Sequence, residues 1–258
     1  MNLRIALLLF IAAPLAAQPD ATAVVERGRD LVTAGHLSGS VDSLMAARAT
    51  LGIALEADDP DAAAWAGYYT ALADYRLSYI FWGQDAARAL QHAEQGAAVL
   101  EDALATSGLG DDARAEMLAL KATLLGTQMG LDQSRAMSLG QAATQATATS
   151  MRLAPGNPRV LFQSATSLLN TPPEWGGDPA LAATQLEDAI TRFGASTGLE
   201  PGWGEDDANA WLGMAHLMMG DASAARPYID RAASLNPSSS FVQYKLMPWL
   251  EQLEGEEG

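Results

Sequence analysis

The stretch of residues 206–237 constrains the fold of this chain more than any other. Gly213 and Ala225 are small residues at positions where two helices can approach each other closely. Gly220 lies between them and suits the left-handed backbone that commonly follows a helix. Asp221 comes next and can cap a second helix. The stretch therefore predicts two antiparallel helices joined by a tight turn.

The spacing of its small and apolar residues resembles the tetratricopeptide repeat, a helical hairpin of about 34 residues. Two positions depart from that pattern, because His216 replaces a usual aromatic and Pro227 lies early in the second helix. The resemblance implies a right-handed solenoid in which each hairpin is stabilised by stacking on its neighbours. The matching positions are Leu212, Gly213, Gly220, Ala225, Ile229, Ala232 and Pro237.

Weaker copies of the same pattern appear upstream, so the chain is expected to be an all-α solenoid of antiparallel helical hairpins. Apolar residues at helical spacing indicate about eleven helices and no convincing strand. Small-residue or proline-containing segments separate them, including a loop at residues 35–40 and a turn in which Asp111 or Asp112 is the expected helix cap. The helical stretches are 21–34, 41–57, 61–81, 85–105, 113–129, 134–154, 157–170, a helix ending at 193, two helices within 206–237, and 241–253.

A second resemblance covers residues 153–220. A Pro-Arg helix start at 158–159, a Thr-Pro…Gly-Gly loop at 171–177 and a Pro-x-Trp-Gly loop at 201–204 occur in this order. This combination resembles a group of exported bacterial tetratricopeptide proteins. The resemblance supports the fold and an extracytoplasmic compartment, and it implies no reaction.

Residues 1–17 have the pattern of a secretory signal peptide. Arg4 precedes a short apolar run that ends in small residues, and this run is too short to span a bilayer comfortably as an anchor. We therefore expect a periplasmic or secreted protein without stable membrane insertion after cleavage. Residues 18–254 form the expected tetratricopeptide-like domain, and residues 255–258 an acidic tail. The chain contains no cysteine, which excludes disulfides and a lipid-modified N-terminal cysteine.

The net charge and the sequence motifs exclude several classes of function. A net charge of −16 argues against nucleic acid and against anionic lipid as partners, because both need basic surfaces. His36, His92 and His216 lie on three different segments, without the convergent ligand pattern of a zinc site. No nucleophile motif or phosphate-binding loop occurs. We expect no catalytic residue, no metal and no cofactor, and therefore no enzyme.

The best candidates for recognition are aromatic. Trp65, Tyr69, Arg76 and Tyr79 share one face of the helix at 61–81. In the tetratricopeptide family such a helix lines the concave groove, although the same rings can instead pack against neighbouring helices. Trp175 and Trp203 lie in the two Gly- and Pro-rich loops, where they either lock the loop onto the helices or contact a ligand.

The expected function is a non-catalytic scaffold or adaptor that binds a protein or peptide partner in the bacterial envelope. The alternative is a helical protein that binds a small ligand for an envelope transporter. The two differ in shape, because an adaptor needs an open groove and a carrier needs an enclosed pocket.

Overall fold

The computed structural model describes residues 20–195 and 197–257, so the predicted signal peptide at 1–17 lies outside the described residues. Within them the chain is all-helical, as predicted, with eleven α-helices and no strand. No helix in this part is both long and apolar enough to cross a bilayer. The helices are α1 (Ala21–Ser38), α2 (Val41–Leu55), α3 (Pro60–Phe81), α4 (Ala86–Leu104), α5 (Asp111–Leu131), α6 (Ala136–Leu153), α7 (Pro158–Asn170), α8 (Pro179–Arg192), α9 (Glu205–Met218), α10 (Ala222–Leu235) and α11 (Met247–Glu257).

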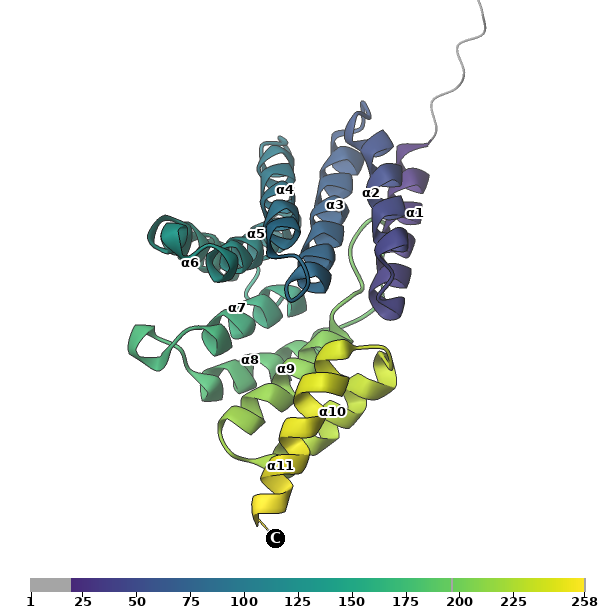
Figure 1. The fold of residues 1–258 in the computed structure, drawn as a ribbon. Helices are drawn as coiled ribbons and strands as arrows, with labels where there is room; N and C mark the ends of the chain where they lie inside the picture. Colours follow the sequence, from purple (N-terminus) through teal and green to yellow (C-terminus); the bar gives the residue numbers. More distant parts are fainter. Residues whose placement is uncertain (1–19, 196, 258) are drawn as a thin grey trace, which may run out of the picture.

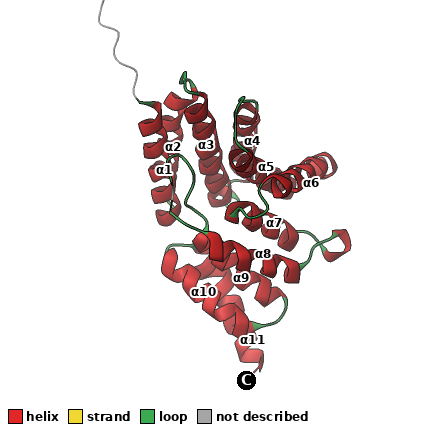
Figure 2. Ribbon diagram, turned by 180° about the vertical axis from the view of Figure 1, so that it is seen from behind, coloured by secondary structure: helices red, strands yellow, loops and turns green. Residues whose placement is uncertain are grey.

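Consecutive helices pack as antiparallel pairs, and the pairs stack into a curved solenoid (Figures 1 and 2). The first helices of the pairs, α1, α3, α5, α7 and α9, contact one another in series and form the inner layer. The second helices, α2, α4, α6, α8 and α10, pack on the outside of their partners. Three short segments, η1 (Gln133–Arg135), η2 (Pro173–Trp175) and η3 (Val242–Leu246), lie between α-helices.

The last hairpin confirms the two antiparallel helices and the tight turn predicted for residues 206–237. Gly220 has a φ of 79°, and the Asp221 side chain caps α10 by accepting a hydrogen bond from the backbone N–H of Ala224. A Cβ on Gly213 would lie 2.5 Å from Ile229 Cγ1, so only glycine allows α9 and α10 to pack this closely. Leu250 of α11 is fully buried, and this helix covers the open end of the stack.

Several helix ends differ from the sequence prediction, and three of them change the role of a residue or segment. α1 continues to Ser38 through the expected loop, because Gly35 serves a close contact with Leu44 and Gly39 (φ 64°) ends the helix instead. Gly110 is the N-cap of α5, so Asp111 and its neighbour lie in the first turn without capping it. α11 extends to Glu257 and includes most of the segment expected as an acidic tail.

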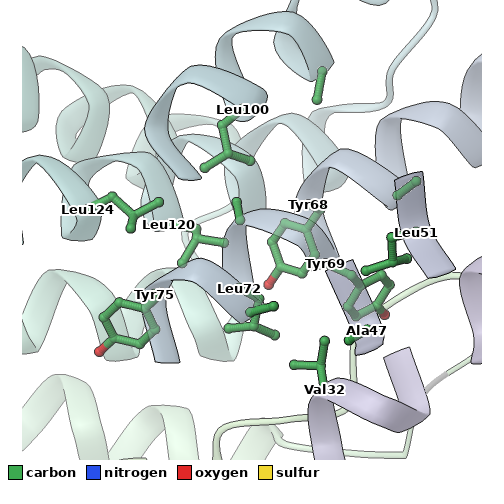
Figure 3. Close-up of a cluster of buried hydrophobic side chains, with 14 of the residues drawn as sticks. Val32, Ala47, Leu51, Tyr68, Tyr69, Leu72, Tyr75, Leu100, Leu120 and Leu124 are labelled. Atoms are coloured by element: carbon green, nitrogen blue, oxygen red, sulfur yellow. The ribbon is translucent and has the colours of Figure 1, made fainter. Parts of the chain in front are cut away.

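α3 lies at the centre of the core. Most of its side chains are buried, because α1, α2, α4 and α5 all pack against it. Tyr68 and Tyr69 are fully buried, and their rings meet edge to face at 5.3 Å (Figure 3). Leucines from the adjacent helices, among them Leu51 and Leu100, surround them.

Candidate functional site

The loop between α8 and α9 runs across the inner layer formed by the first helices of the pairs (Figure 1). We call residues 197–204 the strap. The Tyr69 hydroxyl donates to the backbone oxygen of Leu199 at 2.9 Å, and Arg29 Nη1 donates to the oxygen of Gly198 at 2.7 Å. Tyr69 is fully buried as a result, and burial raises its pKa above the usual value. Of the two alternatives for Tyr69, an open groove or packing inside the fold, its burial favours the second, because the chain's own strap covers it.

Trp203 fixes the end of the strap. Its indole Nε1 donates to the Tyr68 hydroxyl at 3.0 Å, and its ring meets Phe162 edge to face at 6.1 Å. The guanidinium of Arg76 lies 5.1 Å from the centre of the same indole. Of the two roles expected for Trp203, these contacts favour the structural one, because the side chain holds the loop against α3 and α7.

A buried ion pair connects the strap to three inner helices. Arg159 Nε of α7 lies 2.7 Å from Glu116 Oε1 of α5, and the two side chains are 9% and 2% exposed. The Tyr68 hydroxyl of α3 donates to Glu116 Oε2 at 3.0 Å, while Asn157 donates to Oε1 at 2.8 Å. Burial and the Glu116 charge raise the Tyr68 pKa well above its usual range. Arg159 belongs to the Pro-Arg helix start and Trp203 to the Pro-x-Trp-Gly loop, so these two sequence motifs meet in one network.

Arg76 is paired across the fold. Its Nη2 lies 2.5 Å from Asp207 Oδ2 at the start of α9, and its side chain is only 11% exposed. Burial lowers the Arg76 pKa, but the Asp207 charge outweighs burial and the pKa is raised overall. Arg76 therefore links α3 to the last repeat instead of standing free in a groove.

Two aromatic side chains remain accessible at the end of α3. Tyr79 is 46% exposed and Trp82 is 40% exposed, and their rings lie 6.0 Å apart. Tyr75 connects them to the interior, because its ring is 5.0 Å from Tyr79 and 5.3 Å from the Arg76 guanidinium. We call Tyr79 and Trp82 the aromatic ledge.

The strap divides the inner face into two hollows. The inner pocket has a volume of about 230 Å³ between α1, α3, the strap and the start of α9. Its lining includes Val32, His36, Tyr69, Leu72, Arg76 and Trp203. The second hollow, of about 410 Å³, is more polar and is bordered by Trp65, Asp112, Glu116, Arg159 and Glu200.

The structure thus separates the six candidate residues. Tyr69, Arg76 and Trp203 meet at the inner pocket, Trp65 borders the second hollow, and Tyr79 belongs to the ledge. Trp175 stands apart on η2 and is 81% exposed, which does not fit a loop-locking role.

That loop is instead held by the close approach of Gly177 to the backbone of residue 171. A Cβ on Gly177 would overlap the Thr171 carbonyl group. The Gly177 N–H also donates to the oxygen of Pro172 at 3.1 Å.

A cluster at the edge of the inner pocket has no signal in the sequence. His36 Nε2 of α1 lies 2.7 Å from Asp206 Oδ2 and 3.9 Å from Asp207 Oδ2, both from the first turn of α9. Asn236 Nδ2 donates to Asp206 Oδ2 at 3.1 Å. Burial raises the Asp206 pKa, but His36, Arg76 and Asn236 together hold it well below its usual range. Because His36 and Asp206 lie 170 positions apart in the chain, no sequence motif reveals this cluster.

The other two histidines have separate roles. His92 Nδ1 lies 2.8 Å from Asp74 Oδ1, which also lies 3.0 Å from Arg48 Nε, so this buried cluster joins α2, α3 and α4. The His216 ring stacks on Tyr228 at 5.6 Å. Neither histidine lines the inner pocket.

Comparison with known proteins supports the architecture. The chain matches no protein-family model and is similar to no curated protein. Among solved structures it is similar to the HusA haemophore from Porphyromonas gingivalis, with a TM-score of 0.61 and 22% identity over 78% of this chain and 95% of the haemophore. A weaker likeness, with a TM-score of 0.43 and 16% identity, is to an assembly chaperone of RpL4, covering 92% of this chain and 98% of the chaperone. The haemophore likeness shows a shared helical-repeat fold.

Proposed function

We propose that this chain is a non-catalytic adaptor of the tetratricopeptide type in the bacterial envelope, and that it binds a protein or peptide partner. One observation carries the proposal: contacting side chains on α3 connect a pocket lined by Arg76 to the exposed rings of Tyr79 and Trp82. Tyr, Trp and Arg are the residues most enriched at binding hot spots. Such a pocket and ledge fit one anchoring side chain and the residues beside it.

The volume of the pocket favours an anchored partner over a long peptide in a groove. The strap fills the part of the inner face that Tyr69 and Arg29 would otherwise present. The inner pocket beside the strap, of about 230 Å³, is smaller than the roughly 300–1,000 Å³ of pockets for drug-sized ligands. One side chain of a partner fits this space, and its neighbours would lie over the ledge.

Affinity capture from the native envelope tests the proposal when the bait is compared with a matched variant. We expect a partner that is retained by the wild-type domain and lost from Tyr79→Ala/Trp82→Ala. Tyr244→Ala is the control, because Tyr244 is 79% exposed but lies outside the ledge. A partner retained equally by all three baits would show that the ledge is not the binding surface.

A small-ligand carrier for an envelope transporter is the second candidate. It is favoured by the position of the inner pocket between α1, α3 and the strap, and by the likeness to a haemophore. Native mass spectrometry of the domain purified from its own envelope separates the candidates. A small molecule bound to the wild type and absent from Leu72→Trp, which fills the pocket, would favour the carrier.

The envelope location has its own test. Cleavage of the predicted signal peptide would give a mature N-terminus at about Gln18. N-terminal sequencing of the exported protein should find it, and an intact Met1 in a membrane fraction would contradict the location.

A further inference from the structure

We infer that His36, Asp206 and Asp207 form a binding site for a divalent transition-metal ion, with zinc as the test ion, at the edge of the inner pocket. One ligand atom from each of the three side chains lies within 4.8 Å of the others. One imidazole nitrogen and two carboxylate oxygens are ligands that Zn²⁺ takes in proteins. The site joins α1 of the first hairpin to α9 of the last.

The distances are close to those of a zinc site. With bonds of about 2.0–2.2 Å, two ligand atoms of a tetrahedral zinc ion lie about 3.3 Å apart. His36 Nε2 lies 2.7 Å from Asp206 Oδ2 and 3.9 Å from Asp207 Oδ2, so the two distances fall on either side of this value. Shifts of about 0.6 Å, within reach of side-chain rotation, would bring His36 Nε2 to zinc spacing from each carboxylate oxygen, and the ligand atoms of the two carboxylates lie within 4.8 Å of each other.

Both carboxylates already have outer partners that would orient them. Metal-ligating carboxylates are usually hydrogen-bonded to further side chains, which fix their orientation. Arg76 donates to both oxygens of Asp207, and Asn236 donates to Asp206. Asn236 is 3% exposed and the Arg76 side chain is 11% exposed, so packing restricts the positions of both partners.

Charge and access also fit a cation. Asp206 and Asp207 carry two negative charges against one positive charge on Arg76, so one negative charge is uncompensated when His36 is neutral. The three ligand side chains are 14–17% exposed, so solvent screens this charge only partly. His36 and Asp206 line the inner pocket, which provides an entry path and space for a water molecule as the fourth ligand. Hard ions such as Mg²⁺ and Ca²⁺ are less suited, because they prefer oxygen ligands alone.

The inference is tested by removing bound metal from the domain with a chelator and then titrating it with Zn²⁺ in a calorimeter. We expect one equivalent of Zn²⁺ to bind, and the saturable binding to disappear in His36→Gln and in Asp206→Asn. His216→Gln is the matched control, because His216 stacks on Tyr228 away from the pocket and its loss should leave the zinc stoichiometry unchanged. Less than one equivalent on the wild type, or undiminished binding by His36→Gln, would overturn the inference.

Cobalt substitution keeps the test decisive if a variant fails to fold. Co²⁺ added to the wild-type domain should give visible absorption bands of a four- or five-coordinate site with nitrogen and oxygen ligands. Addition of Zn²⁺ should remove these bands by competition. A spectrum identical to that of hydrated Co²⁺ would overturn the inference without any variant.

Discussion

Replacing Arg159 by leucine should strongly destabilise the fold. The change leaves Glu116, 2% exposed, without its cation. Removing one partner of a buried ion pair costs about 3–5 kcal/mol. Glu116 keeps hydrogen bonds from Tyr68 and Asn157, which places the expected loss near the lower end, at about 3 kcal/mol. For a domain of this size, that loss lowers the melting temperature by about 6–12 °C.

Thermal unfolding of three variants measures the effect. Arg135→Leu is the surface control, because the Arg135–Glu94 pair is more than 40% exposed on both sides and such pairs contribute only about 0–1 kcal/mol. The double variant Arg159→Leu/Glu116→Gln removes the unpaired charge and should recover part of the lost stability. An Arg159→Leu variant that melts like Arg135→Leu, or a double variant that melts below the single one, would refute the stabilising role assigned to the buried pair.

Three further predictions concern packing and pH. Gly177→Ala should lower the melting temperature, because its Cβ would overlap a backbone carbonyl, whereas Gly126→Ala, with no atom within 4 Å, should raise helix stability by about 0.5–1 kcal/mol. Ala225→Leu should overpack the last hairpin and cost about 1–3 kcal/mol in urea unfolding, and an unchanged midpoint would contradict the register assigned to that hairpin. Since the folded-state pKa of Asp206 lies below its unfolded value of about 3.9, its contribution to stability is present above that pH and is lost as the pH falls below it. The difference in unfolding free energy between the wild type and Asp206→Asn should therefore shrink from pH 6 to pH 3, and a constant difference would contradict the assigned pKa shift.

The helical architecture could be predicted because its signals are local. Gly213, Gly220 and Ala225 lie within one hairpin: Gly213 and Ala225 are small where the two helices meet, and Gly220 provides the left-handed turn between them. Similar patterns of small, apolar and turn residues recur along the chain, so the number of helices and most of their limits can be predicted from residues close in sequence. α1 was predicted to end too early because Gly35 has a packing role that its identity alone does not distinguish from a helix end.

The site could be predicted only in part. Helical periodicity placed Tyr69, Arg76 and Tyr79 on one face of α3, but it cannot distinguish a face open to solvent from one covered by a distant segment. The strap that covers Tyr69 comes from 130 residues further along the chain and has no periodic pattern. The meeting of His36 with Asp206 likewise depends on how far the whole solenoid curves, which no single repeat determines.

The strap also changes how the molecule should fold. In an ordinary solenoid each repeat contacts only its neighbours, so repeats at one end can unravel while the others persist. Here Arg29 and Tyr69, in the first two hairpins, make hydrogen bonds to residues 198 and 199. Those early hairpins complete their contacts only after most of the chain is present, and closing such a long loop slows folding. The domain should therefore unfold in one cooperative step, and shortened versions that lack the strap should leave the first hairpins incompletely ordered.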